Sequence, residues 1–301
     1  MLLLVMYDRT VKAAPFEYAR AGSVGEACAL LARHGDDVKL IAGGQSLVPM
    51  MAMRLLRPGW LVDINEITAL KFIRLDGQGA RIGACTRQVT VETDDALAGR
   101  VPLLRQALAW VGHIQTRNRG TLGGSLAHAD PSAELPLAAL VLGARMVLRS
   151  TAGARTLEAK AFFTGAMSTA LRADECLEEI QWPAWPEART GSAFTELGIR
   201  HGDFAIVAAA AQVALDAGGR CVRAAFGLGG TGATPLEFPG IAKHLAGTKM
   251  EEGAILHAAR AAAAECEPGN DLHASADYRR HLAGVLAARA LRSARDKAIA
   301  L

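Results

Sequence analysis

The chain has 301 residues, of which 51% are hydrophobic and 21% are charged, so it is neither disordered nor collagenous nor a coiled coil. Its length predicts two domains, and its formal net charge of +3 gives little reason to expect nucleic acid as a partner. The apolar start, residues 1–6, is too short to span a bilayer and lacks the features of a signal peptide, so we expect no membrane span.

The first sixty-odd residues predict a compact α/β unit. Ser23 and Glu26 have the spacing of a capping box, which indicates that a helix begins there and ends before Gly35. A pair of glycines then separates a strand from a second helix. The elements expected after the first helix are a strand, a helix and a strand, at about residues 38–42, 46–56 and 60–64.

The middle of the chain mixes short strands and helices. Asp76 and Gly77 predict a hairpin between two strands, and helical patterns follow at about residues 90–98 and 102–111. The polar, glycine-rich stretch 113–136 then predicts a long loop, which a compact domain rarely carries unless the loop binds something. Regular structure resumes at residues 137–142, 145–149 and 155–157.

Pro183 and Pro186 break the pattern of regular elements, and we expect the boundary between two domains there. The second domain should contain three strands and two long helices. The strands are expected at about residues 192–199, 205–215 and 222–228, and the helices at 255–266 and 278–299. The expected domains are residues 1–182, divided into subdomains of about 1–65 and 66–182, and residues 183–301.

The first segment that could carry chemistry joins a strand to a helix through Gly43 and Gly44. Glycines let the backbone approach a ligand closely, and the N-terminus of the following helix offers free N–H groups and a partial positive charge. Such a junction can hold a phosphate without lysine or arginine. The alternative is an ordinary tight turn in which Ser46 caps the helix.

A second glycine pair, Gly123 and Gly124, lies within the long polar stretch and has Thr121 and Ser125 on either side. Two segments that combine glycines with hydroxyl groups favour a ligand with more than one phosphate, held from both sides. Neither segment has the Gly-Lys-[Ser/Thr] ending of a Walker loop, so a simple nucleoside-triphosphate site is not indicated.

Two further segments belong to the second domain. Residues 227–232 fit the pattern G-x-G-x-x-G, but Pro235 follows closely and no long helix comes next, so we expect a strand-end loop rather than a dinucleotide site. Residues 200–204 form a charged hairpin tip between two apolar strands. This tip is either a solvated turn or a loop that leans over a cofactor from the second domain.

The sequence shows no evident catalytic or metal-binding group. His113, His128 and His201 lack a carboxylate at a telling spacing, and no Ser-His-Asp, HExxH or nucleophile-elbow pattern occurs. The five cysteines are scattered and form no CxxC pair, which argues against disulfides and against a zinc or iron–sulfur site in this chain. We therefore expect no catalytic residue, no metal ligand and a location in the reducing cytoplasm.

These segments together resemble a known family. Residues 42–49, Ala-Gly-Gly-Gln-Ser-Leu-Val-Pro, and residues 113–125, which contain Thr-Leu-Gly-Gly-Ser, are similar to the two flavin-binding motifs of a group of FAD-binding subunits. These are the medium subunits of molybdenum hydroxylases of the carbon monoxide dehydrogenase and xanthine dehydrogenase type. The resemblance runs from about Pro15 to Ala290. Later landmarks of the family are matched by residues 130–136, 200–205 and 227–231.

The resemblance implies an α+β fold and an FAD site. The fold would be a two-subdomain FAD-binding domain of the vanillyl-alcohol-oxidase (PCMH) type, followed by a small α+β domain with a three-stranded antiparallel sheet and helices. The glycine motifs would embrace the FAD pyrophosphate, with Glu134 on the adenosine side and Arg200 near the isoalloxazine. The implied FAD-binding residues are Ala42, Gly43, Gly44, Gln45, Ser46, Leu47, Thr121, Leu122, Gly123, Gly124, Ser125, Glu134 and Arg200.

The resemblance also implies a division of labour among subunits. A large partner subunit holds the molybdenum–pterin cofactor and oxidises the substrate, and a small partner carries two [2Fe–2S] clusters. This chain passes the electrons from FAD to an external acceptor, and the implied assembly is an (LMS)2 heterohexamer. Two alternatives are a stand-alone FAD-dependent oxidase or dehydrogenase of the same fold, and a binding protein without flavin. The intact glycine pairs argue against the second alternative.

Overall fold

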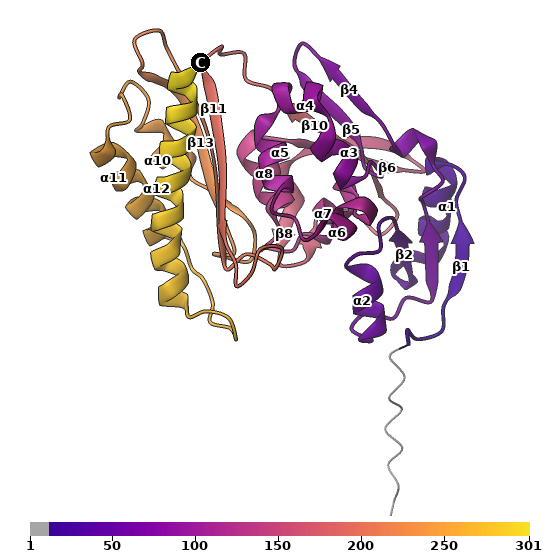
Figure 1. Cartoon of the computed structure of the whole chain (residues 1–301). Coiled ribbons are helices and arrows are strands. Elements are labelled where there is room, and N and C mark those ends of the chain that lie inside the picture. The colour runs from indigo at the N-terminus through magenta and orange to yellow at the C-terminus, as the bar shows by residue number, and fades with distance from the viewer. Residues whose placement is uncertain (1–11) are drawn as a thin grey trace, which may run out of the picture.

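The computed structural model describes residues 12–301, and the apolar start at residues 1–6 lies outside them. The described chain folds into three larger sheets and one two-stranded sheet, with helices between and around them (Figure 1). None of the helices that are described is long and apolar enough to cross a membrane.

The first unit of the chain combines three short parallel strands with two helices. The strands are β1 (Glu17–Arg20), β2 (Val38–Ile41) and β3 (Trp60–Asp63), and the helices are α1 (Val24–His34) and α2 (Leu47–Ala52), with 3-10 helices at Gly35–Asp37 and Thr68–Leu70. The strands lie in the order β1-β3-β2. Ser23 caps α1 by accepting a hydrogen bond from the N–H of Glu26, as the spacing predicts. The carboxylate of Glu26 accepts a bond from Gly22, one residue before the expected partner.

The second unit is a five-stranded antiparallel sheet surrounded by short helices. The strands are β4 (Ile73–Asp76), β5 (Gly79–Gly83), β6 (Arg145–Ser150), β7 (Gly153–Glu158) and β10 (Cys176–Pro183), in the order β4-β5-β10-β6-β7. The helices are α3 (Gln88–Thr93), α4 (Asp95–Arg100), α5 (Pro102–Leu108), α6 (Ile114–Arg119), α7 (Leu122–His128), α8 (Glu134–Leu142) and α9 (Ala159–Phe162). A two-stranded sheet contains β8 (Phe163–Gly165) and β9 (Ser168–Thr169). Every residue of α8 is buried, so this helix lies at the centre of the main hydrophobic core.

The C-terminal unit is an antiparallel sheet covered on both faces. Its strands are β11 (Thr190–Leu197), β12 (Val207–Leu215), β13 (Cys221–Gly229) and β14 (Leu236–Glu237), and its helices are α10 (Pro239–Lys243), α11 (Glu252–Glu265) and α12 (Ala276–Ala300). Helix α12 lies along the outer face (Figure 1), and Gly227 on the inner face lies against Leu137 and Val141 of α8. Every residue of β12 is therefore buried, and its run of alanines lets both layers approach closely.

The structure corrects the sequence-based expectations in four places. The helix expected at about residues 90–98 is two helices, α3 and α4, which are separated at Asp94. The C-terminal sheet has four strands rather than the three expected, because Leu236–Glu237 adds a two-residue strand at its edge. The stretch 113–136 is not a loop, because it contains α6, α7 and the start of α8. The helix expected at 46–56 ends at Ala52, and Arg54 turns the chain with a positive φ of 57°.

Candidate functional site

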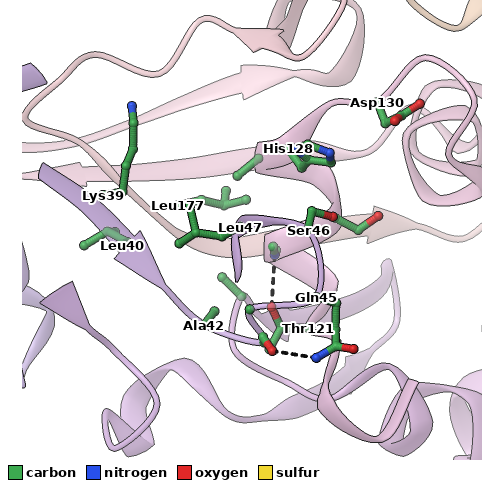
Figure 2. Close-up of a pocket in the computed structure, with 18 of the residues that line it drawn as sticks. Lys39, Leu40, Ala42, Gln45, Ser46, Leu47, Thr121, His128, Asp130 and Leu177 are labelled. Atoms are coloured by element: carbon green, nitrogen blue, oxygen red, sulfur yellow. Dashed lines mark hydrogen bonds between the residues drawn. The ribbon is translucent and has the colours of Figure 1, made fainter. Parts of the chain in front are cut away.

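A cavity of about 770 Å³ lies where the three units meet, and its size is in the range of sites for cofactors and other small molecules. Both glycine pairs lie in its wall, and Figure 2 shows Gln45, Ser46 and Thr121 gathered on one side of it. Of the expected FAD-binding residues, the structure brings together Ala42, Gly43, Gly44, Gln45, Ser46, Leu47, Thr121, Gly123, Gly124, Ser125 and Glu134. Leu122 points into the hydrophobic core instead, and Arg200 does not line the cavity.

The first glycine motif presents unused backbone donors to the cavity. Within the described residues, the N–H groups of residues 43–46 donate no hydrogen bond inside the chain. Gly44 has a φ of +70°, a backbone conformation that favours glycine. Ser46 lies at the N-cap position of α2 but makes no side-chain capping bond, which is the bond that the tight-turn alternative requires. The Gln45 side chain donates to the Gly43 carbonyl at 3.0 Å and steadies the loop (Figure 2).

The second glycine motif is the first turn of α7. The N–H of Gly123 donates to the Ala84 carbonyl at 2.8 Å, and the N–H of Gly124 donates to the Thr121 hydroxyl at 3.1 Å (Figure 2). A Cβ on Gly123 would lie 2.5 Å from the Cβ of Ala84. The backbone donors of this motif are therefore used inside the chain, unlike those of the first. The second motif can contact a ligand through its hydroxyl groups and through the surface of its closely packed backbone.

The two glycine motifs touch each other directly. A Cβ on Gly43 would lie 2.5 Å from the carbonyl oxygen of Arg119 and 2.8 Å from the Cα of Gly120. Gly43 follows a strand of the first unit, whereas Arg119 and Gly120 join α6 to α7 in the second unit. The cavity is thus closed on one side by a backbone-to-backbone contact between units.

The hairpin tip at residues 200–204 leans over the cavity from the C-terminal unit. Gly202, Asp203 and Phe204 line the cavity. The His201 ring lies 5.4 Å from the Trp110 ring, and a Cβ on Gly202 would lie 2.7 Å from the His113 ring. The two histidines therefore hold the hairpin against the second unit, and they do not line the cavity themselves. His128, the third histidine considered above, does line it.

Several charged lining residues were missed by reasoning from the sequence. They are Asp36, Lys39, Arg172 and Glu175. Figure 2 shows Lys39 on the opposite side of the cavity from Asp130. The four missed residues come from two segments that are distant in the chain, residues 36–39 and 172–175, and neither segment is a recognised motif. The nearness of Asp36 and Lys39 to the first glycine pair is the signal that could have indicated their place.

Two buried carboxyl groups lie between the second unit and the C-terminal sheet. Glu134, at the start of α8, lines the cavity, and Glu196 lies on β11 with an Oε2 atom that has no hydrogen-bond partner. Burial raises the pKa of Glu134 to about 7, and the charge of Asp130 adds to the shift. Burial also raises the pKa of Glu196 to about 9, and the charge of Glu134 adds to it. At neutral pH Glu196 therefore favours the protonated form, whereas Glu134 is divided about evenly between its protonated and ionised forms.

The raised pKa values predict that the flavin-free chain loses stability as the pH rises. An acid whose folded pKa exceeds its unfolded value stabilises the fold below the unfolded pKa, and this contribution disappears as the pH rises through the folded pKa. The melting temperature should thus fall by several degrees between pH 5 and pH 9. Glu196→Gln should make this fall smaller, because glutamine cannot ionise. Thermal melts monitored by circular dichroism across this pH range would measure the effect.

Comparison with a control variant isolates Glu196 from the other ionisable groups. Glu158→Gln removes an exposed carboxylate that pairs with Lys160, so the pH dependence should stay as in the unaltered chain. If Glu196→Gln follows the same curve as Glu158→Gln, Glu196 is not the buried acid that makes the fold sensitive to high pH.

The G-x-G-x-x-G segment is a structural contact. Gly227 and Gly229 end β13 and lie against side chains of α8, and no helix follows directly. The N–H of Gly230 donates to the Pro131 carbonyl at 2.9 Å. The segment is the strand-end loop that the sequence predicts, and it faces the second unit of the same chain.

Residues 12–301 contain no cluster of three or more His, Cys, Asp or Glu side chains that could hold a metal ion. The five cysteines are free thiols, and all are buried. Burial raises the pKa of Cys85, which lines the cavity, to about 12, so its thiol stays protonated.

Comparison with known proteins gives matches along nearly the whole chain. The family described as the FAD binding domain in molybdopterin dehydrogenase matches residues 14–185, and the CO dehydrogenase flavoprotein C-terminal domain matches residues 192–294. The 6-hydroxypseudooxynicotine dehydrogenase complex subunit alpha of Paenarthrobacter nicotinovorans is 40% identical, covering 96% of this chain and 97% of that protein. The carbon monoxide dehydrogenase medium chain of Hydrogenophaga pseudoflava is 39% identical, covering 93% and 96%.

Solved structures give the same result. Carbon monoxide dehydrogenase from Hydrogenophaga pseudoflava, in a form that lacks the Mo-pyranopterin moiety, matches with a TM-score of 0.92 and 38% identity, covering 95% of this chain and 99% of that one. Quinoline 2-oxidoreductase from Pseudomonas putida matches with a TM-score of 0.90 and 37% identity, covering 96% and 99%. These matches confirm the expected fold, an FAD-binding domain followed by a C-terminal domain of the CO dehydrogenase flavoprotein type.

Proposed function

This chain belongs to the family of FAD-binding subunits of molybdenum hydroxylases, and we propose that it takes electrons from iron–sulfur clusters on a partner subunit and delivers them to an external acceptor. Its cofactor is FAD, and the enzyme that contains it is an oxidoreductase of the dehydrogenase type. Bound FAD supplies the chemistry, because a flavin can accept and release electrons singly or in pairs. The residues of this chain would bind and position it.

The single observation that carries the proposal is the convergence of both glycine motifs on one cavity. The free N–H groups of residues 43–46 suit the negative charge of a pyrophosphate. The hydroxyl groups of Thr121 and Ser125 lie in the same wall. The cavity also has the size that a dinucleotide needs. These features suit the binding of FAD, and the proposed electron transfer requires no further catalytic group in the chain.

The site residues are part of the same proposal. Residues 42–47 and 121–125 would hold the pyrophosphate region of FAD, with Leu122 supporting the second motif from the core. Glu134 would bind the adenosine side, and the raised pKa of its carboxyl group, about 7, makes a protonated form that can donate a hydrogen bond accessible near neutral pH. Arg200 does not line the cavity itself. It would lie near the isoalloxazine because it belongs to the hairpin whose residues 202–204 line the cavity.

The assembly with partner subunits is proposed from the family to which the chain belongs. We expect a large subunit with the molybdenum–pterin cofactor, a small subunit with [2Fe–2S] clusters, an (LMS)2 heterohexamer and a cytoplasmic location. Relatives named as a medium chain or as a complex subunit support this division.

We also propose that the domain boundary lies near residue 183, with domains 1–182 and 183–301, because β10 ends at Pro183 and β11 begins a separate sheet at Thr190.

Purification of the tagged chain from its native cells would test the proposal. We expect two further subunits, one large and one small, to co-purify with molybdenum, iron and FAD, as measured by metal analysis and the visible spectrum. Substrate should reduce the clusters of the complex even after its flavin is removed, whereas turnover with an external acceptor should be lost. The same purification without the tag is the control. A chain that arrives alone, yellow and active on a substrate, would instead be a stand-alone flavoenzyme.

A further inference from the structure

The side chain of Asn65 is hydrogen-bonded to the loop of the first glycine motif. Asn65 follows β3, and its side-chain Nδ2 donates to the carbonyl of Ala42 at 2.8 Å and to the carboxylate of Asp63 at 2.7 Å. The Asn65 N–H also donates to Asp63, at 2.8 Å. Because Ala42 directly precedes the glycine pair, the position of Asn65 sets where the loop leaves its strand.

Arg87 continues this contact into the second unit. Its guanidinium donates to the Oδ1 of Asn65 at 2.8 Å and also to the carbonyl of Arg119. The neighbouring N–H of Gln88 donates to the carbonyl of Gly120 at 2.9 Å. Arg119 and Gly120 are the residues against which Gly43 lies. Arg87 is therefore bonded on one side to Asn65 and on the other to the segment that leads into the second glycine motif.

We propose that Asn65 and Arg87 are positioning residues for FAD, because they form one continuous hydrogen-bonded brace from the Ala42 carbonyl to the Arg119 carbonyl. The inference rests on the proposed function, since it takes both glycine motifs as the FAD site. Neither side chain lines the cavity, so the pair acts through the two loops rather than by touching the cofactor.

The residue types suit this role. The asparagine amide donates to Ala42 and accepts from Arg87 at the same time, which neither aspartate nor leucine can do. The arginine fork reaches two acceptors at once, whereas a lysine ammonium is a single point of charge. Hydrogen bonds from a charged donor are also stronger than those between neutral groups. The brace thus resists separation of two loops that belong to different units of the fold.

The test is titration of the full-length, flavin-free chain with FAD, with the dissociation constant and the visible circular dichroism of the bound flavin as readouts. Arg87→Ala and Asn65→Ala should each weaken binding about tenfold, the loss expected for a hydrogen bond to a charged group. The double variant should be no weaker than either single variant, because breaking one link already breaks the brace. The circular dichroism of the bound flavin should change in the same way in all three variants.

Arg100→Ala is the matched control, because Arg100 also donates to backbone carbonyls, those of Asp76 and Gly77, but away from the cavity. Its FAD affinity should stay within about twofold of the unaltered chain, as expected at a site that does not couple to the cavity. Arg87→Lys keeps the charge but not the fork, and it should bind FAD with an affinity between those of Arg87→Ala and the unaltered chain.

Three outcomes would overturn the inference. Unaltered affinity in Arg87→Ala, with only a lower melting temperature, would make the brace a contact for stability alone. Unaltered affinity in Arg87→Lys would show that the fork is not needed. Effects that add in the double variant would show two independent contacts. Failure of the unaltered chain to bind FAD would instead count against the proposed function.

Discussion

Replacing Gly43 by alanine is expected to lower the FAD content of the purified chain. The added Cβ would lie 2.5 Å from the Arg119 carbonyl oxygen and 2.8 Å from the Gly120 Cα, and neither neighbour is a flexible side chain that could move aside. The two glycine motifs would therefore separate. Overpacking of this kind costs roughly 1–3 kcal/mol, so the dissociation constant for FAD should rise about 10- to 100-fold.

The FAD-to-protein ratio after gel filtration, and titration of the flavin-free chain with FAD, would measure this loss. Gly77→Ala is the matched control, because a Cβ at Gly77 meets no atom within 4 Å. Far-ultraviolet circular dichroism of both variants separates loss of the cofactor from loss of the fold. An unchanged affinity in a folded Gly43→Ala chain would mean that close approach of the two motifs is not required for binding.

The first glycine motif could be predicted because its signal is local. A strand, two glycines and a helix follow one another within residues 38–52, so periodicity and glycine placement suffice to locate the turn. The same reasoning found the hairpin between β4 and β5 and the cap of α1, whose determining residues are also close in the chain. The free donors of residues 43–46 follow from this local geometry.

The sequence predicted the second glycine motif as a ligand-binding segment, but it did not predict that this segment forms a helix. Helices α6 and α7 have six and seven residues, too few for helical propensity or periodicity to identify them. They are held by contacts from a distant segment: the N–H of Leu122 donates to Thr86, and the N–H of Gly123 donates to Ala84. Only the folded chain shows that these contacts use the backbone donors that a free loop would offer to a ligand.

The hydrogen-bonded brace between the two glycine motifs could not be predicted from the sequence either. Asn65 and Arg87 belong to no motif, and each would pass as an ordinary polar residue after a strand or before a helix. Their roles depend on two carbonyl groups, of Ala42 and Arg119, that any residue type would supply. Contacts between a side chain and a distant backbone atom leave no pattern of residue types to read.

Gly230→Ala is expected to loosen the C-terminal sheet from the FAD-binding domain. Gly230 has a φ of +72°, and a Cβ there would lie 2.6 Å from the Ile206 carbonyl oxygen. Arg279 donates to the carbonyls of both Ile206 and Gly230, at 2.5 Å and 3.2 Å, so the clash falls within an ordered network. The strain should cost roughly 1–3 kcal/mol, which lowers the melting temperature by about 2–4 °C per kcal/mol.

The consequence for the cofactor follows from the partner of the Gly230 N–H. That group donates to Pro131, and the neighbouring Asp130, Ala133 and Glu134 line the cavity, so a shifted Gly230 should also weaken FAD binding. Gly232→Ala is the control, because its Cβ would meet only atoms at 3.5 Å or more. Thermal melts with and without FAD would show both effects. If Gly230→Ala instead weakened FAD binding at an unchanged melting temperature, the G-x-G-x-x-G segment would be a nucleotide contact, contrary to its position at the end of β13 without a following helix.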